Sequence, residues 1–303
     1  MQTLRTPDAC FAGLPGYPFA PHYAEVADGD GGTLRVHHLD EGPADAAPVL
    51  LLHGEPTWSY LYRHMVPPLV AAGHRVIAPD LVGFGRSDKP TEVTDHTYAR
   101  HVGWMAELLF DHLDLRDITL FVQDWGGLIG LRLVAAQPDR FARLVLSNTG
   151  LPTGHGRPTE AFLAWQRFSQ EVEVFPVGPM IDGGTTSDLP PEVVAAYDAP
   201  FPDERHKAGA RILPSLVPTS PDTPDALDNQ AAWEVLEAFD RPVLLAYSDQ
   251  DPITAGADAP FLRRVPGAAG RPHTTVEGGG HFVQEDRGPE LARIIAGFIA
   301  ANR

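Results

Sequence analysis

The sequence predicts an α/β protein with a mostly parallel, doubly wound sheet and a helical cap insertion. Three observations support this fold class: short apolar runs recur along the chain, segments with helical spacing separate them, and one proline-rich stretch lacks such runs. Strands buried on both faces appear as continuous apolar runs, and their alternation with helices is typical of parallel sheets. The 303 residues are enough for one large domain or two coupled ones.

The expected elements follow one another regularly along most of the chain. The core strands are expected at residues 49–53, 76–78, 118–122, 144–147 and 243–247. Apolar residues at helical spacing predict helices between them, at residues 60–72, 97–113, 126–137 and 230–239. A short run at 274–276 and a helical segment at 289–301 follow.

This alternation stops near Leu151. Residues 152–229 are rich in proline and contain scattered aromatic side chains, and strand-like runs are missing. We therefore expect residues 1–151 and 230–303 to form the core and residues 152–229 to form a helical cap. Ligands of open parallel sheets bind beyond the carboxyl ends of the strands, so a cap there would enclose the site. A loop-rich extension that only adds stability is the alternative.

Composition narrows the class of protein. A net charge of −17 argues against nucleic acid and anionic membranes as partners. No apolar stretch approaches the ~18 residues that a membrane span needs, and the N-terminus lacks the pattern of a secretory signal. The single cysteine, Cys10, cannot form an intrachain disulfide. We expect a soluble cytoplasmic protein.

Asp124 lies where a buried strand passes into a helix, in the segment VQDWGG of residues 122–127. A sharp strand-to-helix turn exposes one side chain above the sheet, as in a nucleophile elbow. Gly126 and Gly127 relieve crowding where the helix meets the strand, and the helix N-terminus favours negative charge. We expect Asp124 to be a nucleophile, although a helix-capping aspartate would fit the same position.

A histidine and an acid complete the expected triad. His281 lies in a loop after three glycines, and Asp251 follows the strand expected at 243–247. The order nucleophile, acid, histidine matches that of hydrolases with such an elbow. Asp249 competes for the acid role, but Asp251 lies farther beyond the strand and can reach back under His281. Asn148, at the end of the preceding strand, cannot supply a carboxylate.

A carboxylate nucleophile suits displacement at a saturated carbon. It forms an ester, which water can hydrolyse once His281 removes a proton, whereas a serine would form a stable ether. Hydrolysis passes through an oxyanion on Asp124 itself. The backbone N–H groups of Trp125 and Glu55 are the expected donors to this oxyanion.

The residue beside the nucleophile points to the leaving group. The indole N–H of Trp125 donates without accepting, which suits a halide because a halide needs stabilisation rather than a proton. Glu55, taken as ionised, could only accept. Trp165, near the start of the expected cap, is the candidate second donor, and Trp233 is the other tryptophan after Trp125. Aromatic packing is the ordinary alternative role for either donor.

Over nearly its whole length the chain resembles the haloalkane dehalogenases of the α/β-hydrolase superfamily. The most specific segments are HGEPTWSY at 53–60, VQDWGG at 122–127 and APFPD at 199–203. The subgroup it resembles has a cap tryptophan as second halide donor and its acid after the seventh strand. The resemblance implies haloalkane and water as substrates, a halide ion and an alcohol as products, and no cofactor or metal. It also implies the residue roles given above: nucleophile Asp124, halide donors Trp125 and Trp165, acid Asp251 and base His281.

The substrate pocket is expected to be apolar, which strengthens electrostatic contacts to a halide. Its candidate walls are Leu128, Phe162, Phe168, Pro214, Leu216, Val217 and Ile253. Leu128 replaces a bulkier aromatic residue of some relatives, so the preferred chain length stays open.

Three other functions are weaker alternatives. An epoxide hydrolase shares the Asp nucleophile and His base but needs tyrosine hydroxyls in the cap, where Tyr197 is the only tyrosine. A fluoroacetate-type dehalogenase needs cations near the nucleophile, and Gly126 and Gly127 stand there instead. A non-catalytic protein on the same scaffold would not require a complete triad.

Overall fold

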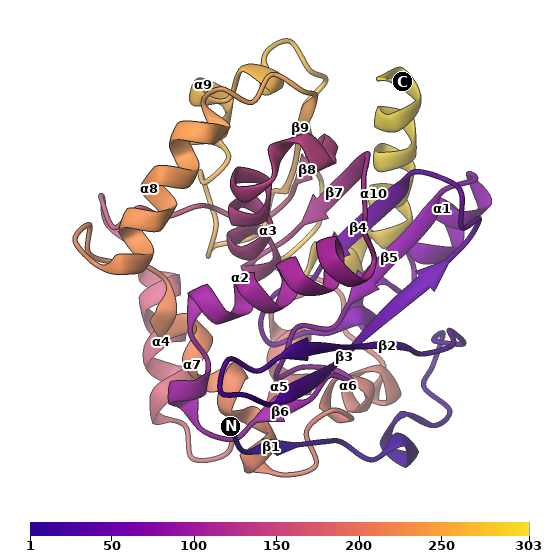
Figure 1. Cartoon of the computed structure of the whole chain (residues 1–303), viewed down its shortest axis with the longest axis vertical. Coiled ribbons are helices and arrows are strands. Elements are labelled where there is room, and N and C mark those ends of the chain that lie inside the picture. The colour runs from indigo at the N-terminus through magenta and orange to yellow at the C-terminus, as the bar shows by residue number, and fades with distance from the viewer. Residues whose placement is uncertain (303) are drawn as a thin grey trace.

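The computed structural model describes residues 1–302 and is built around a mixed central sheet (Figure 1). The strands of this sheet are β2 (His22–Ala27), β3 (Thr33–Glu41), β4 (Pro48–Leu52), β5 (Arg75–Pro79), β7 (Ile118–Val122), β8 (Phe141–Leu146), β9 (Val243–Ser248) and β10 (Thr274–Val276). Within residues 1–302 they form an eight-stranded sheet of order β10-β9-β8-β7-β4-β5-β3-β2. Along the part of the sheet ordered β10-β9-β8-β7-β4-β5, every neighbouring pair of strands is parallel, which confirms the predicted α/β class.

The two N-terminal strands were not predicted from the sequence. β3 pairs antiparallel with both β5 and β2, so this edge of the sheet departs from the parallel pattern. β2 buries only Val26 and β3 is partly exposed at its ends, so neither shows the continuous apolar run that marks the inner strands. A separate antiparallel pair joins β1 (Thr3–Leu4) to β6 (Lys89–Pro90).

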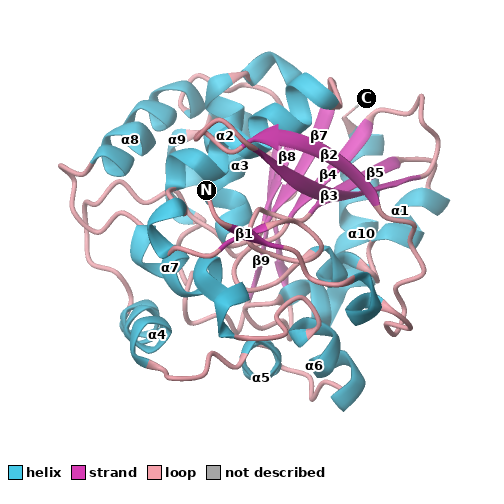
Figure 2. Ribbon diagram, turned by 60° about the horizontal axis from the view of Figure 1, so that its bottom comes forward, coloured by secondary structure: helices cyan, strands magenta, loops and turns pink. Residues whose placement is uncertain are grey.

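Helices cover both faces of the sheet (Figures 1 and 2). On one side lie α2 (Tyr98–Ala106), α3 (Trp125–Ala136) and α8 (Pro224–Leu236), and on the other α1 (Val66–Ala71) and α10 (Val283–Ala301). The helix expected at 60–72 is split into a 3-10 turn, Ser59–Tyr62, and the short α1. Among residues 1–302, no helix has both the length and the apolar character needed to cross a membrane.

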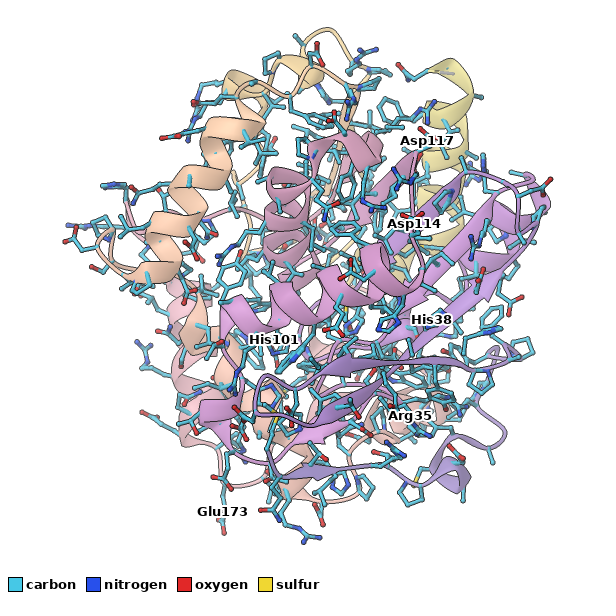
Figure 3. All side chains as sticks on the ribbon, in the orientation of Figure 1. Arg35, His38, His101, Asp114, Asp117 and Glu173 are labelled. Atoms are coloured by element: carbon cyan, nitrogen blue, oxygen red, sulfur yellow. The ribbon has the colours of Figure 1, made fainter. Side chains whose placement is uncertain are left out.

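The segment before the elbow strand is tightly shaped. α2 continues into a π-helix, Glu107–His112, and a short turn then leads into β7. Asp114 and Asp117, both labelled in Figure 3, have positive φ angles of 39° and 52° in this turn. Aspartate tolerates that conformation better than most residues, so the chain can reverse sharply into β7.

Four helices gather below the sheet in the view of Figure 2. They are α4 (Glu160–Glu171), α5 (Val177–Gly183), α6 (Pro191–Asp198) and α7 (Ala208–Leu216). α4 packs against α7, and α5 packs against α6. The expected boundary at residue 229 falls inside α8, which packs on α3, so the division into core and cap stays a prediction.

Candidate active site

Asp124 occupies the turn between β7 and α3. Its φ of 50° and ψ of −129° are costly for a residue with a side chain, and such strain gathers at functional sites. The turn is held by hydrogen bonds from Asp124 N to Asn148 O (2.9 Å) and from Thr149 Oγ1 to Asp124 O (2.7 Å). A Cβ on Gly126 would lie 1.9 Å from Leu52 O, so only glycine lets α3 begin this close to β4.

The loop after β4 meets the Asp124 carboxylate. Glu55 N donates to Asp124 Oδ1 at 2.8 Å. The loop is closed on itself, because Thr57 N and Thr57 Oγ1 both donate to Gly54 O, at 3.0 and 2.8 Å. A Cβ on Gly54 would lie 2.2 Å from Asp124 Oδ1. Glycine at this position therefore allows the carboxylate to approach the backbone donor.

His281 bridges two carboxylates. Its Nδ1 lies 3.0 Å from Asp251 Oδ2, and its Nε2 lies 3.5 Å from Asp124 Oδ2. Both His281 and Asp251 are buried. Asp249 is exposed and accepts instead from Gly278 N at 2.8 Å. The structure thus brings Asp124, His281 and Asp251 together and leaves Asp249 outside the group.

The charges of this group depend on one another. Burial alone would lower the pKa of His281, but the charges of Asp251 and Asp124, with hydrogen bonds to both, raise it to about 10. Burial alone would raise the pKa of Asp251, but its interactions with His281 and hydrogen bonds from Thr254 and Ile253 lower it to about 2. At neutral pH in the site without substrate, the imidazole of His281 is therefore charged and the carboxyl group of Asp251 is ionised.

Glu55 differs from the expectation of an ionised side chain. It is only 3% exposed, and burial, followed by the charge of Asp124, raises its pKa well above the ordinary value. A hydrogen bond with the Trp165 side chain and the charge of His281 oppose this rise only in part. The neutral acid is favoured because a buried carboxylate beside another is costly. A neutral Glu55 can donate as well as accept, unlike the ionised side chain that the sequence analysis assumed.

The site opens into a cavity of about 730 Å³. Asp124, His281, Trp125 and Trp165 all line it. Most of the expected walls also line it, namely Leu128, Phe162, Phe168, Pro214, Val217 and Ile253. Walls that the sequence did not indicate include Thr149, Met180, Gly183, Pro218, Phe261 and Phe282.

Leu216 is the exception among the expected walls. It is not one of the residues that line the cavity, and it is partly buried against the hydrophobic core instead. α7 ends at Leu216 and the backbone of Val217 is already extended, so the helical spacing of this segment does not tell which of its side chains face the cavity. Apolar character alone could not separate these neighbours.

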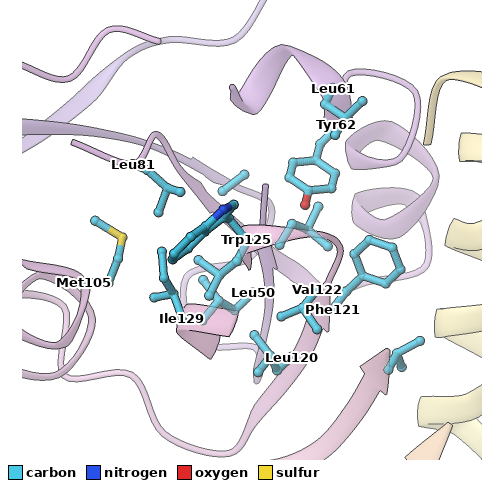
Figure 4. Packing of buried hydrophobic residues seen from close by; sticks show 14 of the residues in the cluster. Leu50, Leu61, Tyr62, Leu81, Met105, Leu120, Phe121, Val122, Trp125 and Ile129 are labelled. Atoms are coloured by element: carbon cyan, nitrogen blue, oxygen red, sulfur yellow. The ribbon is translucent and has the colours of Figure 1, made fainter. Parts of the chain in front are cut away.

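Three tryptophans line the cavity, but they are not equivalent. Trp233 Nε1 donates to Leu151 O at 2.8 Å, so its N–H is already engaged. Trp125 packs edge-on against Tyr98, with ring centroids 5.0 Å apart, and Figure 4 shows its ring among buried aliphatic side chains. Trp165 stacks on Phe168 at 5.9 Å. Trp125 and Trp165 stay the candidate donors to a halide, and a halide would take the Trp165 N–H from the Glu55 side chain, with which Trp165 forms a hydrogen bond in this structure.

Two polar residues that sequence reasoning missed as functional fix the histidine loop. Asn148 Nδ2 donates to Ser248 Oγ (2.8 Å), Gly280 O (2.9 Å) and His281 O (3.1 Å). Gln123 Nε2 lies 3.1 Å from His281 O and 3.2 Å from His281 Nε2. Gln123 precedes the nucleophile in the elbow motif, which was the one available signal.

Among residues 1–302, no group of three or more His, Cys, Asp or Glu side chains could hold a metal ion.

Several of the known proteins most similar to this chain are haloalkane dehalogenases. The model of the alpha/beta hydrolase fold family matches residues 47–190. A haloalkane dehalogenase of Psychrobacter cryohalolentis is 58% identical, over 100% of this chain and 99% of the relative. One of Mycobacterium marinum is 54% identical, over 98% and 99%. The solved structure of haloalkane dehalogenase DpaA from Paraglaciecola agarilytica NO2 has a TM-score of 0.89 at 36% identity, and the match covers 97% of each chain.

Proposed function

The chain belongs to the haloalkane dehalogenases of the α/β-hydrolase fold, and from this premise we propose that it cleaves the carbon–halogen bond through an ester on Asp124. The substrates of this enzyme are a small haloalkane and water. The proposal assigns each step to residues of the cavity. It takes residues 152–229, which include α4 to α7, as the cap over that cavity.

In the first step the Asp124 carboxylate attacks the carbon that carries the halogen. A carbon–oxygen bond forms, and the carbon–halogen bond breaks with its electron pair on the halide. The indole N–H groups of Trp125 and Trp165 donate to this halide. Neutral Glu55 supports the step because it adds no negative charge beside the departing anion.

In the second step water attacks the carbonyl carbon of the ester, and His281 accepts the proton of that water. The resulting oxyanion on Asp124 is stabilised by N–H groups of Glu55 and Trp125. The contact of Glu55 N with Asp124 Oδ1, at 2.8 Å, supports this assignment. The alcohol leaves with the proton held by His281, and Asp124 then returns to its carboxylate by passing its own proton to His281, which restores the imidazolium of the resting site.

The position of Tyr197 argues against epoxide hydrolysis as the main activity. Its hydroxyl donates to Glu285, and the side chain is fully buried. Tyr197 is also absent from the residues that line the cavity within the described chain, 1–302. A tyrosine hydroxyl from the cap is therefore not placed to protonate an alkoxide.

The observation that carries the proposal is the Asp124 carboxylate held between Glu55 N–H and the His281–Asp251 pair in an apolar cavity. The test is release of bromide and protons from 1,2-dibromoethane, with styrene oxide as a parallel substrate. We expect bromide release by the unmodified enzyme and none by Asp124→Ala. Bromide release that survives in Asp124→Ala, or turnover of styrene oxide alone, would overturn the proposal.

A further inference from the structure

The side chain of Gln123 lies within hydrogen-bonding distance of both the imidazole and the backbone carbonyl of His281. Gln123 is fully buried, and its Nε2 is 3.1 Å from His281 O and 3.2 Å from His281 Nε2. A backbone carbonyl oxygen can only accept, so the amide atom that faces it must be the nitrogen. This contact fixes the orientation of the Gln123 amide, which otherwise could not be assigned from shape alone.

A second glutamine supports the same orientation. Gln284 Nε2 donates to Gln123 Oε1 at 3.5 Å, and Gln284 is also fully buried. The Gln123 carbonyl thus has a donor on one side, and its N–H group faces His281 on the other.

The contact with His281 Nε2 discriminates between the two protonation states of the ring. Asp251 Oδ2 accepts a hydrogen bond from the Nδ1–H group of His281, with 3.0 Å between oxygen and nitrogen. A neutral ring then has an unprotonated Nε2, which can accept from Gln123. A protonated ring would instead place its Nε2–H against the N–H of Gln123, and two donors cannot satisfy each other.

The charged groups around the ring favour the opposite state before the reaction. Asp124, in the elbow, lies 3.5 Å from His281 Nε2, and Asp251 lies in the loop after β9. Both carboxylates stabilise a protonated imidazole. Glu55, from the loop after β4, also faces the ring, although burial favours its neutral form. Alkylation converts Asp124 into an uncharged ester, and the Gln123 donor then opposes Asp251 alone.

We propose that Gln123 is a positioning residue whose amide N–H, held beside His281 Nε2, disfavours the imidazolium in the alkylated enzyme and keeps the imidazole neutral until Nε2 takes the proton of the attacking water. Gln123 therefore serves the hydrolysis step and has no part in alkylation. This inference rests on the proposed function, because it needs an ester on Asp124 and His281 as the base.

The first test separates the two steps in single turnovers of 1,2-dibromoethane across a range of pH. Gln123→Met removes the donor but keeps the length of the side chain. We expect its first halide release to stay within about twofold, while hydrolysis slows about tenfold at pH 7 and its acid limb moves up by about one pH unit. Gln123→Glu, which offers an acceptor, should move the limb farther. Gln230→Met, whose amide serves Thr153 O and Pro221 O, is the control for the substitution itself.

The position of the acid limb separates tuning of the base from packing. Slower hydrolysis in Gln123→Met with an unmoved limb would overturn the inference in favour of a purely structural role. If the unmodified enzyme released no halide in its first turnover, the proposed function itself would be refuted.

A second test does not depend on turnover. Asp124→Asn mimics the uncharged ester, and ¹⁵N NMR of its histidines reports the state of His281. We expect a neutral ring at pH 7 with its proton on Nδ1, and a higher titration midpoint when Gln123→Met is added. A ring that titrates at the same pH with and without the Gln123 amide would overturn the inference.

Discussion

His281 Nε2 lies 3.5 Å from Asp124 Oδ2, whereas His281 Nδ1 lies 3.0 Å from Asp251 Oδ2. The closer carboxylate keeps its charge throughout the proposed reaction, and the more distant one loses it on alkylation. Because the two carboxylates together raise the pKa of His281 to about 10, loss of one charge must lower it. The base is thus protonated while Asp124 attacks and becomes neutral when it is needed.

The first prediction concerns the timing of proton release. A group with a raised pKa is protonated below that pKa, so at pH 8 His281 starts as imidazolium. Alkylation lowers its pKa, and the ring should lose a proton to solvent with the halide, before any alcohol forms. Stopped-flow measurement with a pH indicator and a halide probe should show a proton burst of up to one per site. Protons that appear only at the rate of alcohol formation would contradict this account.

The second prediction separates the chemical steps by removing the base. Alkylation needs the Asp124 carboxylate and the halide donors, but hydrolysis loses a general base worth roughly 10²–10⁴ in rate. His281→Phe should therefore release about one halide per enzyme and then stop. Mass spectrometry should locate the alkyl group on Asp124. An unmodified Asp124 after the burst would exclude the covalent route.

The third prediction tests the second halide donor. A hydrogen bond to a charged group contributes about 1.5–3 kcal/mol, so Trp165→Phe should weaken bromide binding at least ~10-fold while much of the stacking on Phe168 is kept. Bromide quenching of tryptophan fluorescence measures this affinity. Trp233→Phe is the control, because its N–H already donates to Leu151 O. Equal affinities in both variants would remove Trp165 from the halide site.

The sequence was informative where chemistry and topology coincide. Asp124 and Asp251 lie two and three residues beyond the ends of buried apolar strands, so the edge of the sheet where they meet could be predicted before any coordinates. The protonation state of Glu55 could not, since it depends on burial and on the distance to Asp124. The contact of Gln123 with His281 joins residues 158 positions apart in the chain, and no local pattern reports such a contact.

The fourth prediction distinguishes the two candidate acids. Asp251 is buried against His281, whereas Asp249 is exposed and accepts a hydrogen bond from Gly278 N. Asp251→Asn should slow ester hydrolysis strongly, because the imidazolium formed in that step loses its counter-charge, and Asp249→Asn should change it little. Single-turnover rates with thermal unfolding as a folding check measure both. An inactive Asp249→Asn beside an active Asp251→Asn would reverse the assignment.

The fifth prediction concerns how far the substrate extends from Asp124. Gly183 ends α5 and lines the cavity, and a Cβ placed there would have no neighbour within 4 Å. Gly183→Leu should therefore fill part of the cavity without a clash. Catalytic efficiency with 1-bromohexane should fall about 10-fold or more, in line with the 10–200-fold that one methylene group can decide in an apolar pocket. That with 1,2-dibromoethane should stay within about twofold.

Gly297→Leu is the matched control for this change. Gly297 is an exposed position of α10, its Cβ would also have open space, and it is not a wall of the cavity. Both leucines replace glycine in a helix, so any gain in helix propensity is shared by the two variants. A Gly183→Leu enzyme that loses both substrates equally would show that residue 183 disturbs the reacting groups themselves. One that loses neither would show that bound haloalkanes stop short of α5, and the preferred chain would then be shorter than the cavity allows.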